Sequence, residues 1–296
     1  MLVSLFNTMS PVLVCILIGF GWKRLGFEFN QQFVTAAVMN IGAPCLIISS
    51  LNSTRVPLAE FGEVALATAL ITILCGLLAI PFALKAKGDP LSVIAPVAIS
   101  NCGNMGLPLS LFAFGKEGLT LAIAFFITSS IFHMTVGLPL FSRSSTGLKG
   151  TLANLARQPI AYALVISLTL LIMDLHLPVW IDNTTHLLAG FTIPLMLITL
   201  GVSLGSLHND AWLAGVGYSM LRFGGGLVFS LLVTHLMGIT GLAQKVVILL
   251  SIMPAAIFNY IFAAHYNRSP EITASIVVTS TLMAFILLPV ALSFML

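Results

Sequence analysis

Apolar stretches of about twenty residues follow one another along almost the whole chain, and this feature decides what the chain can fold into. Hydrophobic residues make up 58% of the 296 residues. Charged residues make up only 7%, against about 25% in soluble domains. A soluble fold cannot bury so much apolar surface, whereas a bilayer core accepts about 20 apolar residues per helix. The sequence therefore predicts an all-α polytopic membrane protein.

Short polar or Pro/Gly-bearing turns divide the chain into about ten predicted transmembrane spans. They are 2–22, 31–51, 61–84, 91–114, 118–141, 158–175, 184–205, 211–237, 245–265 and 272–294. The first span lacks a preceding basic segment and is followed by Lys23 and Arg24, which is unlike a cleaved signal peptide. We therefore interpret it as a permanent span.

Basic residues are distributed unevenly between the two sets of loops. Loops after odd-numbered spans contain Lys23, Arg24, Lys85, Lys87, Arg143, Lys149, Arg157 and Arg268, whereas the other loops contain Arg55, Lys116 and Lys245. The positive-inside rule then places the odd loops in the cytoplasm and both termini on the outer side of a plasma membrane, the inner membrane in a bacterium. The charges form no cluster, which argues against a nucleic-acid partner.

The prolines indicate an internal duplication. Matching spans carry prolines 148, 150 and 150 residues apart, in the pairs Pro11 and Pro159, Pro44 and Pro194, and Pro139 and Pro289. Because each unit has five spans, an odd number, the second unit must enter the membrane from the opposite side. We predict a first repeat at 1–141, a cytoplasmic linker at 142–157 and a second, inverted repeat at 158–296.

Spans 4 and 9 are both interrupted near their middle. Span 4 contains the run from Ser100 to Pro108, with hinge candidates Gly103, Gly106 and Pro108, and span 9 contains Met253-Pro254-Ala255-Ala256, with Pro254 as its hinge. Unwound backbone at membrane depth is tolerated only inside protein or beside a watery cavity. Two such breaks in equivalent spans predict crossed helices whose second halves present free N–H groups, which attract anions, to the centre.

These residues resemble the auxin efflux carrier family, which includes plant auxin exporters and bacterial malonate or malate carriers. The resemblance is carried by Asn101-x-x-x-Met105-Gly106-Leu107-Pro108-Leu109, by Met253-Pro254-Ala255-Ala256 with the later Phe262-Ala263-x-x-Tyr266-Asn267, and by the surroundings of Pro44 and Pro289. It extends over nearly the whole chain, which lacks the long central loop of many plant members.

The resemblance implies a ten-helix inverted repeat, usually a homodimer, with a scaffold part and a moving transport part that includes the crossed helices. In the family the substrate carboxylate meets the crossover, where Asn101 and Pro254 match the asparagine of the first break and the proline of the second. Ser100 departs from the pattern, because plant members usually have a proline there. The middle of span 3 also lacks the acidic residue that plant members can carry there, so the resemblance assigns no proton site.

Seven residues are candidates for substrate binding: Ser100, Asn101, Asn104, Pro254, Ala255, Asn259 and Arg222. Asn101 and Asn104 either meet the substrate or cap a kinked helix. Asn259 can instead hydrogen-bond backbone groups that Pro254 frees. Arg222, beside three glycines in span 8, either pairs with a substrate carboxylate, snorkels or bonds to the carbonyls that the glycines expose.

His133 in span 5 is the candidate for proton coupling, because histidine ordinarily titrates near neutral pH. The alternative is a neutral histidine that bridges two helices. Gly201-Val202-Ser203-Leu204-Gly205 matches the nucleophile-elbow pattern, but it ends a helical span instead of joining a strand to a helix. The four cysteines form no C-x-x-C pair, and the sequence has no zincin motif or P-loop. We predict no metal, no cofactor and no enzymatic activity.

The predicted function is secondary transport of a small organic anion, such as malonate, malate or an auxin-like acid, by alternating access at the crossover of helices 4 and 9. A proton or a sodium ion is the possible coupling ion, and membrane lipid is the surrounding partner. Two alternatives stay open: a sodium-coupled organic anion symporter of the bile-acid type, and a channel.

Overall fold

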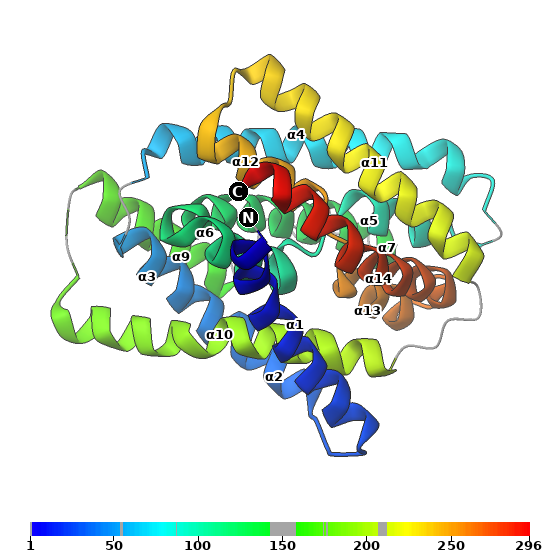
Figure 1. The fold of residues 1–296 in the computed structure, drawn as a ribbon, viewed down its shortest axis with the longest axis horizontal. Coiled ribbons are helices and arrows are strands. Elements are labelled where there is room, and N and C mark those ends of the chain that lie inside the picture. Colours follow the sequence, from blue (N-terminus) through cyan, green and yellow to red (C-terminus); the bar gives the residue numbers. More distant parts are fainter. Residues whose placement is uncertain are drawn as a thin grey trace.

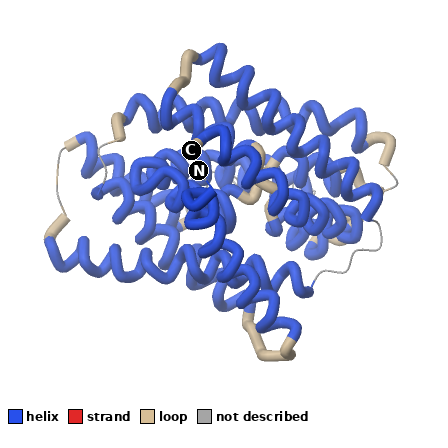
Figure 2. Tube along the Cα trace, in the orientation of Figure 1, coloured by secondary structure: helices blue, strands red, loops and turns tan. Residues whose placement is uncertain are grey.

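The computed structural model describes residues 2–53, 56–86, 88–142, 158–173, 175, 177–206 and 212–296. These residues form an almost entirely helical bundle (Figures 1 and 2). The α-helices and π-helical segments (η) are α1 Leu2–Arg24, α2 Gln31–Ala37, η1 Val38–Gly42, α3 Ala43–Ser53, α4 Leu58–Ala83, α5 Leu91–Ala98, η2 Cys102–Gly106, α6 Leu107–Phe132, η3 His133–Gly137, α7 Leu138–Ser142, α9 Pro159–Ile172, α10 Val179–Ser206, α11 Trp212–Met237, α12 Gly241–Ser251, α13 Ile257–His265 and α14 Pro270–Met295.

The helices confirm the predicted polytopic membrane fold. Seven apolar helical runs in the described residues are long enough to cross a membrane, and the two shorter apolar helices are Pro159–Ile172 and Gly241–Ser251. One long run, Cys102–Phe141, combines half of predicted span 4 with span 5. Its α-helix α6 is kinked at Gly115, where φ is 69°, so the chain turns where the sequence predicts a loop.

Part of the predicted cytoplasmic side falls outside the described residues. This applies to residues 143–157, which make up nearly all of the predicted linker, and to Lys87. Arg55, in a loop predicted on the outer side, also lies outside the described residues. The orientation of the chain in the membrane stays a prediction.

Two sets of helices pack mainly among themselves. We name α1, α2, η1, α3, α9 and α10 the scaffold group, because α10 contacts α1, α2, η1 and α3, while α3 also contacts α9. We name α4–α7 with η2 and η3, together with α11–α14, the crossover group. Its main contacts join α4 to α5, α6 and α11, and α11 to α12 and α14. Figure 1 shows α1 running across α10.

Equivalent helices of the two halves of the chain have corresponding packing partners. The contact of α1 with α10 corresponds to that of α9 with α3, and the contact of α4 with α5 corresponds to that of α11 with α12. Equivalent spans thus have corresponding partners, in the other half of the chain for α1 and α9 and in the same half for α4 and α11, which is the pattern expected of an inverted repeat. The predicted boundaries of the two repeats stay a prediction.

Each of the three described π-helical segments ends two residues before a proline. Gly42 precedes Pro44, Gly106 precedes Pro108 and Gly137 precedes Pro139. Proline has no N–H and its ring clashes with the carbonyl four residues earlier. A wider turn removes this clash without ending the helix. Pro44, Pro108 and Pro139 therefore determine where these helices change between π-helical and α-helical geometry.

Candidate functional site

The two interrupted helices cross and bond to each other through their backbones. The first break lies between α5, which ends at Ala98, and η2; the second lies between α12 and α13. The Asn101 N–H donates to the Pro254 carbonyl at 2.7 Å, and the Ala256 N–H donates to the Ile99 carbonyl at 3.2 Å. These bonds flank an antiparallel bridge between Ser100 and Ala255. The predicted crossing is confirmed, and each break satisfies backbone groups of the other.

Side chains add two further bonds at the crossing. The Ala255 N–H donates to Ser280 Oγ of α14 at 3.0 Å. Asn259 Nδ2 donates to the Ile99 carbonyl at 3.3 Å. Asn259 therefore bonds freed backbone, as the structural alternative predicts, although the backbone belongs to the other interrupted helix. Its Oδ1 atom is buried and lacks a hydrogen-bond partner among the described residues.

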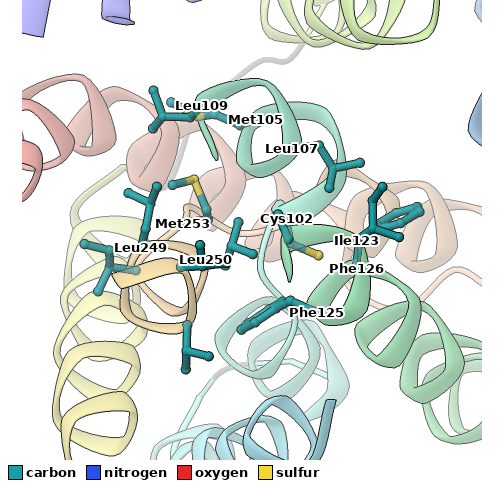
Figure 3. Close-up of a cluster of buried hydrophobic side chains, with 14 of the residues drawn as sticks. Cys102, Met105, Leu107, Leu109, Ile123, Phe125, Phe126, Leu249, Leu250 and Met253 are labelled. Atoms are coloured by element: carbon teal, nitrogen blue, oxygen red, sulfur yellow. The ribbon is translucent and has the colours of Figure 1, made fainter. Parts of the chain in front are cut away.

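An apolar cluster packs between α12 and the first break (Figure 3). Gly106 faces it so closely that an added Cβ would lie 2.4 Å from Leu250 Cδ2. The labelled members of the cluster are Cys102, Met105, Leu107, Leu109, Ile123, Phe125, Phe126, Leu249, Leu250 and Met253. Gly106 and Pro108 thus lie in packed protein.

A cavity of about 250 Å³ lies against the first break. Both groups of helices line it: η1, α9 and α10 from the scaffold group, and η2, α6, η3 and α13 from the crossover group. All three π-helical segments contribute, as is frequent for π-bulges at functional sites. Its lining residues are Met39, Ile99, Ser100, Asn101, Cys102, Gly103, Asn104, Phe126, Ile127, Ser129, Ser130, Ile131, His133, Met134, Gln158, Ile160, Ala161, Leu164, Val165, Met196, Ala256 and Phe258.

Two buried side-chain nitrogen atoms, each on a residue that lines the cavity, lack a hydrogen-bond partner among the described residues. They are Asn101 Nδ2 and His133 Nε2, and their side chains belong to residues that are 4% and 6% exposed. A buried polar atom without a partner costs about 1–3 kcal/mol. A ligand that accepts a hydrogen bond in the cavity would remove this cost.

Backbone amides add hydrogen-bond donors at the same place. Cys102, Gly103 and Asn104 form the first turn after the break, so their N–H groups have no acceptor within their own helix. The positive end of that helix dipole faces the cavity too. Charged side chains do not occur among the described lining residues. The cavity thus offers donors and a partial positive potential at one end and mainly apolar walls elsewhere, with Ser129, Ser130 and Gln158 as further polar residues.

His133 packs against aromatic rings of α13. Its ring centroid lies 4.8 Å from that of Phe262 and 6.4 Å from that of Phe258. The histidine therefore bridges η3 and α13, as its structural alternative predicts. It also lines the cavity, so its predicted role in proton coupling stays a prediction.

Arg222 lies apart from the cavity wall. It is 2% exposed, so it does not snorkel. Its guanidinium donates to the carbonyls of Val97, Ser251 and Met253 at 2.8, 2.7 and 3.2 Å. These carbonyls belong to the crossover and not to the glycines beside Arg222. In this arrangement all three nitrogens of the guanidinium donate to backbone carbonyls, and Arg222 is not among the residues that line the cavity.

The structure thus divides the predicted site residues. Ser100, Asn101, Gly103, Asn104 and His133 line the cavity. Pro254, Ala255 and Asn259 build the crossing behind it.

Sequence reasoning missed the scaffold wall, including Met39, Leu164 and Met196. Apolar residues in apolar spans carry no signal that could have identified them.

Ser203 has no nucleophile-elbow geometry. It lies inside α10, and its hydroxyl accepts a hydrogen bond from Gln31 Nε2 at 2.9 Å. The neighbouring Gly201 contacts α1 so closely that an added Cβ would lie 2.0 Å from the Ile16 carbonyl oxygen. The small residues of this motif therefore serve helix packing. Within the described part of the chain, metal-binding groups of three or more His, Cys, Asp or Glu side chains are absent.

A polytopic helical bundle with two crossed, interrupted helices beside a cavity has the architecture of a membrane transporter. A family model described as "Membrane transport protein" matches residues 145–292, half of the chain. The chain belongs to this family, the auxin efflux carrier family that its sequence resembles.

Two similar proteins come from archaea. An uncharacterized transporter of Methanocaldococcus jannaschii is 26% identical over 296 residues, with 95% of each chain covered. An uncharacterized transporter of Methanothermobacter thermautotrophicus is 26% identical over 297 residues, with 96% of each chain covered. The alignments cover both halves, although the family model matches only the second.

Proposed function

We propose that this protein is a secondary carrier of a small organic anion and that the anion binds in the cavity at the crossover. The observation that carries the proposal is Asn101 Nδ2, a buried donor without a partner among the described residues. It lies beside the first-turn amides of η2, which are donors as well. Carboxylates are favoured at such helix starts.

The walls of the cavity favour one kind of anion. Apolar side chains such as Ile160, Leu164 and Phe258 line most of it, and charged side chains are absent from its described lining. A single carboxylate with an apolar body matches this surface. The second carboxylate of malonate or malate would lack a cationic partner there, because Arg222 is engaged with carbonyls. An auxin-like monocarboxylate is therefore the favoured substrate within the predicted range.

The position of the cavity supports alternating access. It lies between the scaffold group and the crossover group, so relative movement of the two groups would change which side of the membrane it opens to. His133 lies on the described cavity wall and, as the residue type that ordinarily titrates near neutral pH, is the proposed proton carrier if transport is coupled. We place the carrier, as a homodimer, in the plasma membrane with both termini outside.

Thermal stabilisation of the purified protein by organic acids tests the proposal. The panel contains indole-acetate, lactate, malonate, malate and oxalate. Asn101→Ala removes one hydrogen bond to a charged group, worth about 1.5–3 kcal/mol, and is expected to weaken the affinity for the preferred acid about 10- to 100-fold. Asn7→Ala is the matched control, since Asn7 is exposed on α1.

The expected result is stabilisation of the wild type and of Asn7→Ala by a monocarboxylate, with loss of the effect in Asn101→Ala. Stabilisation by none of the acids would contradict an organic anion as substrate. Equal stabilisation of Asn101→Ala and the wild type would contradict the proposed binding position. Saturable counterflow of the stabilising acid in proteoliposomes then separates a carrier from a channel, for which flux would not saturate.

A further inference from the structure

The guanidinium of Arg222 lies where the negative ends of two half-helices meet. Val97 is in the last turn of α5, Ser251 is the last residue of α12, and Met253 follows in the second break. Their carbonyls are among those that a helix end leaves without an intrahelical partner. Arg222 accounts for one carbonyl in each interrupted helix and for one in the break itself.

One turn after Arg222, the backbone of α11 packs directly against the end of α12 at Gly226. An added Cβ at Gly226 would lie 2.1 Å from the Ser251 carbonyl oxygen. Only glycine permits α11 to approach the end of α12 so closely. The carbonyl that contacts Gly226 is also the one that accepts from Arg222 Nη2 at 2.7 Å. The position of the cation is therefore part of the packing between α11 and the crossover.

Three converging carbonyl oxygens at negative helix ends are also the kind of ligands that bind a small cation in transporters with broken helices. In this protein the three carbonyl oxygens accept hydrogen bonds from the Arg222 guanidinium, a cation that is part of the chain. We infer that Arg222 is a resident cation of the crossover, which completes the site that a sodium ion would otherwise occupy. Anion binding in the neighbouring cavity then needs no sodium ion at this position, a consequence that rests on the proposed function.

Arg222 thereby separates the negative helix ends of the crossover from its positive helix start. The guanidinium covers the C-terminal ends of α5 and α12, whose negative potential would repel an anion. The N-terminal turn of η2 stays open toward the cavity, where its positive potential attracts one. Arg222 is therefore a positioning residue that acts through the crossover backbone and does not touch the substrate.

The test measures the melting temperature of purified variants in sodium chloride and in choline chloride at equal ionic strength, and with guanidinium added below denaturing concentrations. Removing the cation in Arg222→Ala leaves three carbonyls unpaired and opens space beside them. Sodium or guanidinium, but not choline, is expected to raise the melting temperature of this variant by about 3 °C or more. The wild type is expected to melt at the same temperature in sodium and choline salts.

Arg222→Lys and Lys245→Ala serve as comparison variants. Lysine keeps the positive charge, so Arg222→Lys should fold and stay insensitive to sodium. Lys245 donates to one exposed carbonyl, that of Met295, at the end of the chain, so Lys245→Ala should show no cation-specific response.

Several results would overturn the inference. One is a higher melting temperature of the wild type or of Arg222→Lys in sodium than in choline. Another is a folded Arg222→Ala whose melting temperature no cation raises. The third is a rise in Lys245→Ala as large as the rise in Arg222→Ala. If Arg222→Ala cannot be purified, the melting temperatures of the wild type and of Arg222→Lys in sodium and in choline still test the inference. None of these measurements requires the anion, so failure of the proposed function is recognised separately, by the acid panel.

Discussion

The scaffold group and the crossover group hold their helices together in different ways. In the scaffold group, α1 and α10 touch through glycines: an added Cβ at Gly19 would lie 2.0 Å from the Ile198 carbonyl oxygen, and one at Gly201 equally close to that of Ile16. In the crossover group, interrupted helices are joined by hydrogen bonds between their breaks, such as that from Asn101 to Pro254. The crossover group also has close glycine contacts, such as that of Gly226 with the Ser251 carbonyl, so the bonds between non-helical segments are what distinguishes it from the scaffold group.

This difference explains where the cavity can form. Continuous helices satisfy their own backbone groups, so the scaffold group contributes a mainly apolar wall, with Gln158 at the start of α9 as its polar member. Interrupted helices leave donors and acceptors free, so the crossover group contributes the polar end. The partners of those groups determine which face of the break is covered by protein and which lies against the cavity. Arg222 closes the carbonyl face, and the Asn101 side faces the cavity.

Gly201→Ala tests the packing of the scaffold group and should have the largest effect on stability. The added methyl group meets the Ile16 carbonyl, which belongs to backbone and cannot move aside alone. We expect a loss of about 3 kcal/mol or more in unfolding free energy, measured in mixed micelles. Gly190→Ala, in the same helix, is the control, because nothing lies within 4 Å of its added Cβ, and it should change stability by less than about 1 kcal/mol. Similar stabilities of the two variants would show that the close contact of α1 with α10 does not hold the scaffold group together.

Arg268→Gln tests bonding at the end of the crossover group and should have an intermediate effect. Arg268 forms a salt bridge with Asp89 and donates to the carbonyls of Phe141 and Leu140 at 3.1 Å each. Both charged side chains are mostly buried, so losing the pair should cost about 2 kcal/mol. In a double-mutant cycle with Asp89→Asn, the two losses should not add. Full additivity would mean that the two residues act independently.

Asn52→Ala tests polar bonding inside the scaffold group and should have the smallest effect. Asn52 Nδ2 donates to Asp182 Oδ1 at 2.9 Å, which joins α3 to α10. Both residues are only partly buried, so we expect a loss of about 1 kcal/mol, measured by the same unfolding assay. A loss larger than that of Gly201→Ala would show that polar bonds, and not helix contact, hold the scaffold group together.

The sequence predicted the breaks and the polar end of the cavity because both have local causes. Proline and glycine disturb a helix where they stand, and asparagine is conspicuous in an apolar span. Ser100, Asn101 and Asn104 could therefore be assigned to one place before any fold was available.

Contacts between distant segments could not be predicted in the same way. The partners of Arg222 come from two other helices, and Asp89 lies 179 residues from Arg268 in the chain. The apolar cavity wall of Met39, Leu164 and Met196 resembles any other part of an apolar span. Their places depend on how the two groups of helices meet, which no local pattern records.

The segment η3 changes the rotation of α7 around the helix axis relative to His133. His133 and Phe141 are eight residues apart, so in an uninterrupted α-helix they would differ by about 80° around the axis. A π-turn absorbs one additional residue and reduces the difference to about 20°. Both side chains therefore meet the same ring, with centroids 4.8 and 6.2 Å from that of Phe262. Deleting one residue from η3 would rotate α7 relative to His133. Phe262 of α13 would then keep its contact with His133 or its contact with Phe141, but not both.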